Sequence, residues 1–211
     1  MLEAYSEARL APYLLAGGSP TRAAALYVWN IEVSAAFVGP LNCLETTLRN
    51  SVHRELTAKY SGPHWWRRAP LNPQSTQKIT EAEQKLTRRG RPTPGPDSVV
   101  AELSFGFWVS LLSRAYDRHL WVPALHRAFP HFSGRRHDLH DALTSLLLFR
   151  NRIMHHEPIH HRALADDHAK LYRVLGYLSP GAADGIKGFD RVPAVLRHRD
   201  DTLSGRRQPR F

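Results

Sequence analysis

A row of leucines marks a long amphipathic segment in the C-terminal half of the chain. Leu139, Leu143 and Leu147 recur at every fourth residue, which places them on one face of a helix. This spacing predicts a helix from about Arg135 to His155. We expect it to end before Pro158, because the residue that precedes a proline avoids the helical region.

The rest of the chain is typical of successive helices separated by glycine and proline. The most regular stripe predicts a helix from about residue 41 to 60, and it consists of Leu41, Leu44, Leu48, Val52, Leu56 and Tyr60. Gly39-Pro40 separates this helix from an earlier one that begins near Pro20. Alternating segments of strand length are almost absent from the sequence. We therefore predict an all-α fold, a bundle of about seven or eight helices.

Proline and arginine are concentrated in residues 88–97, which cannot continue a helix. We interpret this stretch as a loop within one bundle, because neither half of the chain shows a complete core. The predicted domain covers residues 1–180. Residues 181–211 are weakly patterned, so we expect a weakly structured basic tail, with Ser204–Phe211 disordered.

Polar side chains replace the leucines toward the end of the predicted 135–155 helix. Asn151 and His155 are the next members of the four-residue series, and Arg150 follows Leu146 in a neighbouring row. Burying an unpaired group of this kind costs on the order of several kcal/mol. Three explanations are open: a hydrogen-bonded core network, an interface, or a reactive site.

The charge balance favours a polyanionic partner. The chain has 29 basic and 19 acidic residues, a formal net charge of +10, and only five of the basic residues are lysine. The planar guanidinium of arginine binds phosphate oxygens in pairs, and an excess of positive charge attracts nucleic acid. This composition points to RNA or DNA rather than to an acidic protein.

Cysteine content and hydropathy indicate the compartment. The single cysteine, Cys43, excludes an internal disulfide and fits a reducing cytoplasm. The first 30 residues lack the basic and apolar regions of a secretory signal. No uninterrupted apolar run approaches the roughly 18 residues of a membrane span. We expect a cytoplasmic protein with no membrane partner.

Residues His156-Glu157-Pro158-Ile159-His160 match the H-E-x-x-H pattern of zinc proteases. That chemistry requires a helix, so that both histidines face one metal, and a proline inside the motif breaks the helix. We interpret the match as accidental. A looser cluster that adds His155 and His161 is an alternative, but the site that we predict uses no metal and no cofactor.

Arg150, Asn151 and His155 together suit RNA chemistry. Arginine can hold a phosphate and neutralise its growing charge, and histidine can move a proton near neutral pH. RNA supplies its own nucleophile, the 2′-hydroxyl. Positions 150 and 155 lie about 140° apart on an ideal helix. Either the end of the helix is distorted, or two copies of the motif meet across a dimer; a purely structural polar network is the competing interpretation.

The Arg150-Asn151-x-x-x-His155 segment resembles the R-x4-6-H motif of HEPN domains. The wider pattern resembles the Abi-like (abortive infection) family of bacterial HEPN proteins over about residues 5 to 180. The segments that carry this likeness are Tyr27–Asn30, Glu45–Asn50, Ser104–Trp108 and Leu148–Ile159. The resemblance implies a HEPN-like helical bundle that is usually a homodimer, with a composite active site where the two motifs meet.

The same resemblance implies a metal-independent endoribonuclease used in phage defence or as the toxin of a toxin–antitoxin pair. Arg150 would stabilise the phosphate, Asn151 would orient it, and His155 would act as general acid and base. His156 also satisfies the motif spacing, so the choice of histidine is open. The implied partners are RNA and an antitoxin protein or RNA. The alternative is a catalytically inactive HEPN module that binds RNA or another protein.

A second polar set precedes these residues in the chain. Glu45, Arg49 and His53 are spaced by four, and Asn50 follows Arg49. They form either an exposed set of ion pairs or one side of the cleft, where Glu45 and Arg49 would anchor Arg150 or RNA. Two aromatic pairs are expected in the core rather than stacked on bases, namely Trp65-Trp66 and Phe107-Trp108.

Overall fold

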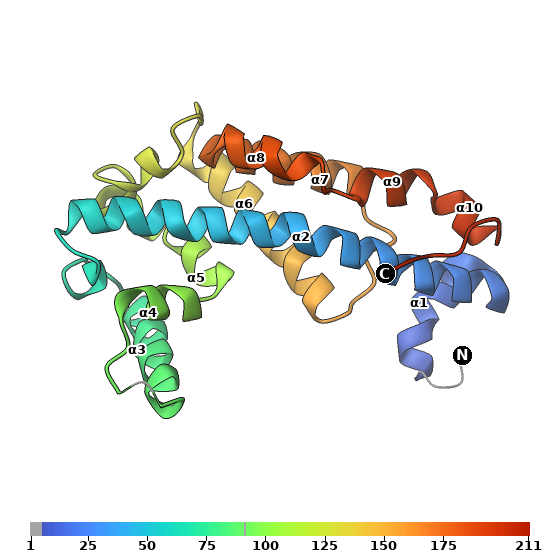
Figure 1. The fold of residues 1–211 in the computed structure, drawn as a ribbon, viewed down its shortest axis with the longest axis horizontal. Helices are drawn as coiled ribbons and strands as arrows, with labels where there is room; N and C mark the ends of the chain where they lie inside the picture. The colour runs from blue at the N-terminus through green and yellow to red at the C-terminus, as the bar shows by residue number, and fades with distance from the viewer. Residues whose placement is uncertain (1–5, 91) are drawn as a thin grey trace. The chain divides into compact units, whose positions relative to one another are not determined.

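The computed structural model describes residues 6–90 and 92–211, and these residues form helices and no β-strand. The prediction of an all-α fold is confirmed. The longest element is α2 (Pro20–Lys59), a single helix of 40 residues (Figure 1). The other α-helices are α1 (Glu7–Gly17), α3 (Pro73–Arg88), α4 (Pro96–Glu102), α5 (Phe105–Ser110), α6 (Arg136–Met154), α7 (Leu164–Leu178), α8 (Pro180–Lys187), α9 (Val192–Arg197) and α10 (Arg199–Leu203).

α2 joins two helices that the sequence predicts as separate. Pro40 lies inside it, where the ring removes one main-chain N–H and disturbs the preceding turn. The apolar stripe nevertheless continues across this position from Val33 and Phe37 to Leu41, and all three side chains are buried. Burial of a continuous stripe on both sides outweighs the local cost of the proline, so the predicted break at Gly39-Pro40 is wrong.

Contacts divide the chain into two compact units. The first comprises the residues up to Asn42 together with Leu148–Tyr172 and Asp184–Phe211, and the second comprises Cys43–Leu147 and Arg173–Ala183. The sequence predicts one domain over residues 1–180, whereas the division falls within the long helices α2, α6 and α7. The Pro/Arg-rich residues 88–97 are not a boundary, because they belong to the second unit.

The buried stripe of α6 differs from the predicted row of leucines. It consists of Leu139, Leu143, Leu146, Phe149 and Ile153. Leu147 is only half-buried, because a helix of 3.6 residues per turn does not keep a strict spacing of four on one face. Arg150 and Asn151 therefore lie at the margin of the stripe and are half-buried. The expected continuation of the buried row into charged residues does not occur.

α8, α9 and α10 occupy most of residues 180–203, so the prediction of a weakly structured tail is wrong for this part, whereas residues 204–211 form no helix. The indole of Trp29 in α2 donates a hydrogen bond to the carbonyl of Val195 in α9 at 3.3 Å. The carboxylate of Glu32 in α2, which is 0% exposed, accepts two bonds from the Arg207 guanidinium at 2.6 and 2.8 Å. These contacts fix the C-terminal segment to α2. Because an ion pair produces no periodic pattern of apolar residues, the sequence shows no sign of this attachment.

The aromatic pairs of the second unit form its core, as predicted. Trp65, Phe107 and Trp108 are each 0% exposed, and Trp66 is 9% exposed. The Trp65 indole donates to Nδ1 of His53 at 3.0 Å. Burial lowers the pKa of His53, so its ring remains a neutral acceptor in this structural bond.

One described helix is apolar enough to cross a membrane by length and composition. An 18-residue window of α2 has a mean hydropathy of 1.3, although the sequence shows no uninterrupted apolar run of that length. Of this window, 56% is buried inside the fold. The core helix of a soluble protein meets the same criterion, and the buried stripe described above accounts for the hydropathy of α2.

Candidate functional site

α6 ends in a left-handed turn at His156. The N–H of His156 donates to the carbonyl of Ile153 at 3.0 Å, and the N–H of Glu157 donates to the carbonyl of Arg152 at 2.8 Å. These two bonds define a Schellman motif, in which the residue after the cap takes the left-handed conformation. His156 accordingly has a φ of 56°, at a position where glycine is the usual residue.

The backbone of His156 is strained. In the described part of the chain, only Ser61 shares a positive φ with it among non-glycine residues. The left-handed conformation costs a residue with a side chain roughly 1–2 kcal/mol. The His156 side chain is exposed, so burial of its ring does not offset this cost. Strained residues of this kind cluster at functional sites, which favours a functional reading of His156.

The segment after this turn is fixed from two sides. Oδ1 of Asn30, a buried residue of α2, accepts hydrogen bonds from the N–H of Ile159 at 2.8 Å and of His160 at 3.1 Å. On the other side, the guanidinium of Arg152 donates to the carbonyl of Pro158 at 3.2 Å. Several bonds therefore impose the geometry of the turn together, which is the condition under which backbone strain persists.

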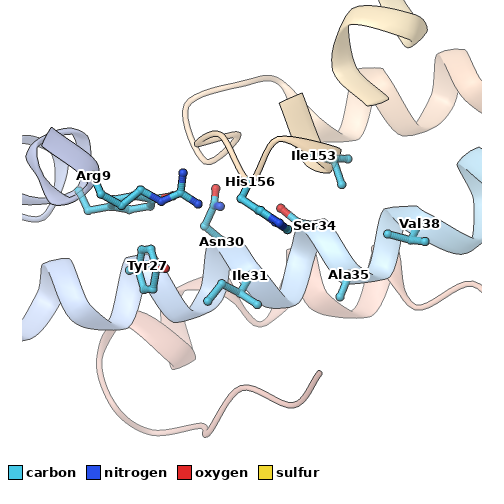
Figure 2. Close-up of a pocket in the computed structure, with 10 residues that line it drawn as sticks. Arg9, Tyr27, Asn30, Ile31, Ser34, Ala35, Val38, Ile153 and His156 are labelled. Carbon is cyan, nitrogen blue, oxygen red and sulfur yellow. The ribbon is translucent and has the colours of Figure 1, made fainter. Parts of the chain in front are cut away.

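A cavity of about 240 Å³ opens beside His156 within the first unit. Figure 2 shows that Arg9 from α1, Asn30 and Ser34 from α2, and His156 point toward the same space. The remaining wall is aromatic and aliphatic, and it consists of Tyr13, Tyr27, Ile31, Ala35, Val38 and Ile153. Three segments that are distant in the sequence thus meet around one partly polar pocket.

Of the candidate residues of the predicted R-x4-6-H motif, His156 lines this pocket, whereas Arg150 and Asn151 do not. Arg150 and Asn151 are half-buried on the last turns of α6. His155 is exposed, and its N–H closes the helix by donating to the carbonyl of Asn151 at 2.9 Å. His156 lines the cavity, whereas the cavity wall does not include His155. Of the two histidines that the spacing left open, the one that lines the cavity is His156.

The H-E-x-x-H segment does not form a metal site. α6 ends at Met154, and residues 157–159 have no regular secondary structure. Across residues 6–90 and 92–211, no three His, Cys, Asp or Glu side chains are arranged to hold a metal ion. The looser histidine cluster does not form, because His160 turns inward and packs its ring on Tyr13 at 5.0 Å between centroids. Burial lowers the pKa of His160, and nearby positive charges lower it further.

The second polar set lies in the other unit. Glu45 and Arg49 are half-buried on α2, Asn50 is exposed, and Nε of Arg49 donates to Oδ1 of Asn50 at 3.4 Å. Arg150 belongs to the first unit. These residues and Arg150 therefore belong to different compact units, and their role at a cleft stays a prediction.

Sequence reasoning missed most of the polar residues that line the cavity. Arg9 and Ser34 are single polar residues on amphipathic helices, and Tyr13 is hidden in an apolar stripe, so their spacing gives no signal. Asn30 falls within Tyr27–Asn30, a segment that carries part of the family resemblance, and this was the one available indication.

Comparison of the chain with protein-family models, with curated proteins and with solved structures finds no match.

Proposed function

We propose that this chain is a metal-independent endoribonuclease of the HEPN type, acting in a bacterial abortive-infection or toxin–antitoxin system of phage defence. The observation that carries the proposal is the strained His156, which faces a partly polar cavity shortly after Arg150 and Asn151 in the chain. A net charge of +10 adds a general attraction for RNA. A residue that adopts a costly conformation beside a cavity supports a chemical role better than a packing role.

The proposed reaction needs no metal because RNA supplies the nucleophile. The 2′-oxygen forms a bond to the adjacent phosphorus while the bond from phosphorus to the 5′-oxygen breaks, which leaves a 2′,3′-cyclic phosphate and a 5′-hydroxyl. An imidazole accepts the proton of the 2′-hydroxyl, and an imidazolium donates a proton to the leaving oxygen. Arg150 stabilises the charge that develops on the phosphate, and Asn151 orients it.

Two imidazoles in opposite protonation states serve these two transfers better than one. A homodimer with a composite site would supply the second histidine from the partner's copy of the motif. Such an enzyme would also need an antitoxin protein or RNA that keeps it inactive until infection. Both features come from the family resemblance, and they are tested by the oligomeric state and by neutralisation of toxicity in cells.

Cleavage of a mixed RNA pool in the presence of EDTA tests the proposal. We compare wild type with Arg150→Ala, His155→Ala and His156→Ala, and use His137→Ala as a matched control, because His137 is an exposed histidine at the other end of α6. Loss of a general acid or base lowers the rate by about 10²–10⁴-fold, and loss of a charge-stabilising donor lowers it by about 10²–10³-fold. We expect Arg150→Ala and His156→Ala to show these losses, with cyclic phosphate ends in the wild-type products.

The individual variants also decide between the two histidines. A loss in His155→Ala but not in His156→Ala would assign the acid–base role to the exposed residue. Equal cleavage by all variants would refute the nuclease assignment. RNA binding without cleavage by wild type, and without toxicity in cells, would support the inactive binding module instead.

A further inference from the structure

The cavity beside His156 contains a buried polar group with no partner. Tyr13 of α1 is 1% exposed, and its hydroxyl makes no hydrogen bond in the described structure. Buried hydroxyls are nearly always paired, because leaving one unpaired is unfavourable. Burial raises the pKa of Tyr13 to about 12, although Arg9 acts in the opposite direction. Tyr13 lines the cavity, so a neutral and unpartnered O–H belongs to one of the residues of the cavity wall.

The amide of Asn30 has a fixed orientation. Its Oδ1 accepts from two main-chain N–H groups, those of Ile159 and His160, so the atom that faces them must be the oxygen and not the nitrogen. What Asn30 can still offer to a ligand is its Nδ2 donor. Arg9 also has donors only. The polar side of the cavity is therefore rich in hydrogen-bond donors and suits a ligand that carries acceptors.

The rest of the cavity wall is apolar and suits the flat face of an aromatic ligand. The ring of Tyr27 is 6% exposed and meets the Tyr13 ring edge to face, with 5.1 Å between centroids. Ile31 and Val38 continue this wall along α2. Single bases in RNA are commonly held by aromatic or apolar contacts on their faces and by hydrogen bonds on their edges. A cavity of about 240 Å³ is smaller than the roughly 300–1,000 Å³ of pockets for drug-sized ligands. It therefore suits one base rather than a nucleic-acid helix.

We propose that this cavity binds a single nucleobase with carbonyl acceptors, guanine or uracil in preference to adenine, and that its source is the RNA substrate. This inference rests on the proposed nuclease function and names the specificity of the same site. Guanine and uracil present carbonyl oxygens to donors such as Arg9 and Asn30, whereas adenine presents an amino group there, which would leave a donor facing a donor. His156 shares the wall, so the bound base belongs to a nucleotide next to the cleaved bond.

Cleavage of oligonucleotides with one ribonucleotide tests the preference. Each substrate is DNA except for a single U, G, C or A ribonucleotide, so that only one bond can be cut. With full-length protein we expect U and G substrates to be cut roughly ten- to a hundredfold faster than A. Tyr13→Phe and Arg9→Gln should reduce this ratio. Tyr172→Phe is the matched control, because it removes the hydroxyl of a half-buried tyrosine of the first unit that does not line the cavity.

Two further measurements keep the test independent of folding and of catalysis. Tyr13→Phe removes a buried unpaired hydroxyl, so its thermal midpoint should equal or exceed that of wild type; a large decrease would show that the hydroxyl already has a partner and would overturn the inference. Calorimetry with uridine 3′-monophosphate and adenosine 3′-monophosphate reports binding without cleavage. Tighter binding of the uridine nucleotide, weakened by Tyr13→Phe, is the expected result.

The outcomes separate the two proposals. Cleavage with no base preference, or with a preference that Tyr13→Phe leaves intact, would overturn the base pocket and leave the nuclease standing. Binding of uridine 3′-monophosphate that depends on Tyr13, in a protein that never cleaves RNA, would refute the nuclease and would overturn RNA as the source of the base, since the ligand would then be a free nucleotide.

Discussion

Replacing His156 with glycine should stabilise the protein and inactivate it at the same time. The φ of 56° places His156 in a conformation that costs a residue with a side chain roughly 1–2 kcal/mol, and glycine adopts it freely. Glycine also makes the unfolded chain more flexible, at a cost of about 0.5–1 kcal/mol. Because the imidazole is exposed, little burial is lost. The net expectation is a gain of about 0.5–1 kcal/mol in the free energy of unfolding.

Thermal unfolding and RNA cleavage measured on the same samples test this reasoning. For a chain of this length, a gain of 0.5–1 kcal/mol corresponds to a rise in Tm of roughly 1–4 °C. His156→Ala should lose the same activity without that rise, because alanine retains the strain. His155→Gly is the matched control: the φ of His155 is not positive, so glycine relieves no strain there and should lower stability by about 0.5–1 kcal/mol. A His156→Gly variant that is less stable than His156→Ala, or one that retains full activity, would refute the argument.

Two predictions concern stability and its dependence on pH. Glu32→Gln removes the buried partner of Arg207 and should lower the free energy of unfolding by about 3 kcal/mol in urea titrations. Burial alone would raise the pKa of Glu32, but its hydrogen bonds lower this pKa below the ordinary 4.5. The wild type should therefore lose the stability that the ionised carboxylate contributes as the pH falls below 4.5, whereas Glu32→Gln should not. Identical acid unfolding curves for the two proteins would contradict this expectation. The pKa of His160 is lowered from 6.5 by burial, so the folded protein keeps the ring neutral and stability should fall as the pH drops below 6.5. His160→Gln should flatten the curve between about pH 7 and 5, and an unchanged slope would show that His160 does not titrate in this way.

The helical class of the fold could be predicted because apolar periodicity is a local signal. The stripe from Leu41 to Leu56 predicted a helix, and each of its members is buried in α2. The break at Pro40 was wrong for a reason that lies outside the local sequence. A proline penalty is a property of one turn, whereas the burial that outweighs it depends on what packs along the whole helix.

The C-terminal helices illustrate a second limit. α9 and α10 are short, so few apolar positions in each can repeat. What fixes them to α2 includes the ion pair between the buried Glu32 and the half-buried Arg207, which are 175 residues apart. A carboxylate in α2 and an arginine near the C-terminus look like ordinary surface residues when read separately, and only the three-dimensional structure shows that they neutralise each other.

The candidate site shows how far a motif can specify chemistry. Spacing identified Arg150, Asn151 and two histidines, but it could not distinguish His155 from His156, because both satisfy the pattern. The distinction comes from the end of α6. A helix that continued beyond Met154 through position 156 would have placed the side chain of residue 156 about 100° around the helix axis from that of residue 155. The left-handed turn removes it from that position, and His156 lines the cavity with Arg9 and Asn30. A glycine would form this turn at lower cost, so the presence of an imidazole there supports the proposal that the side chain of His156, and not only the turn, has a role.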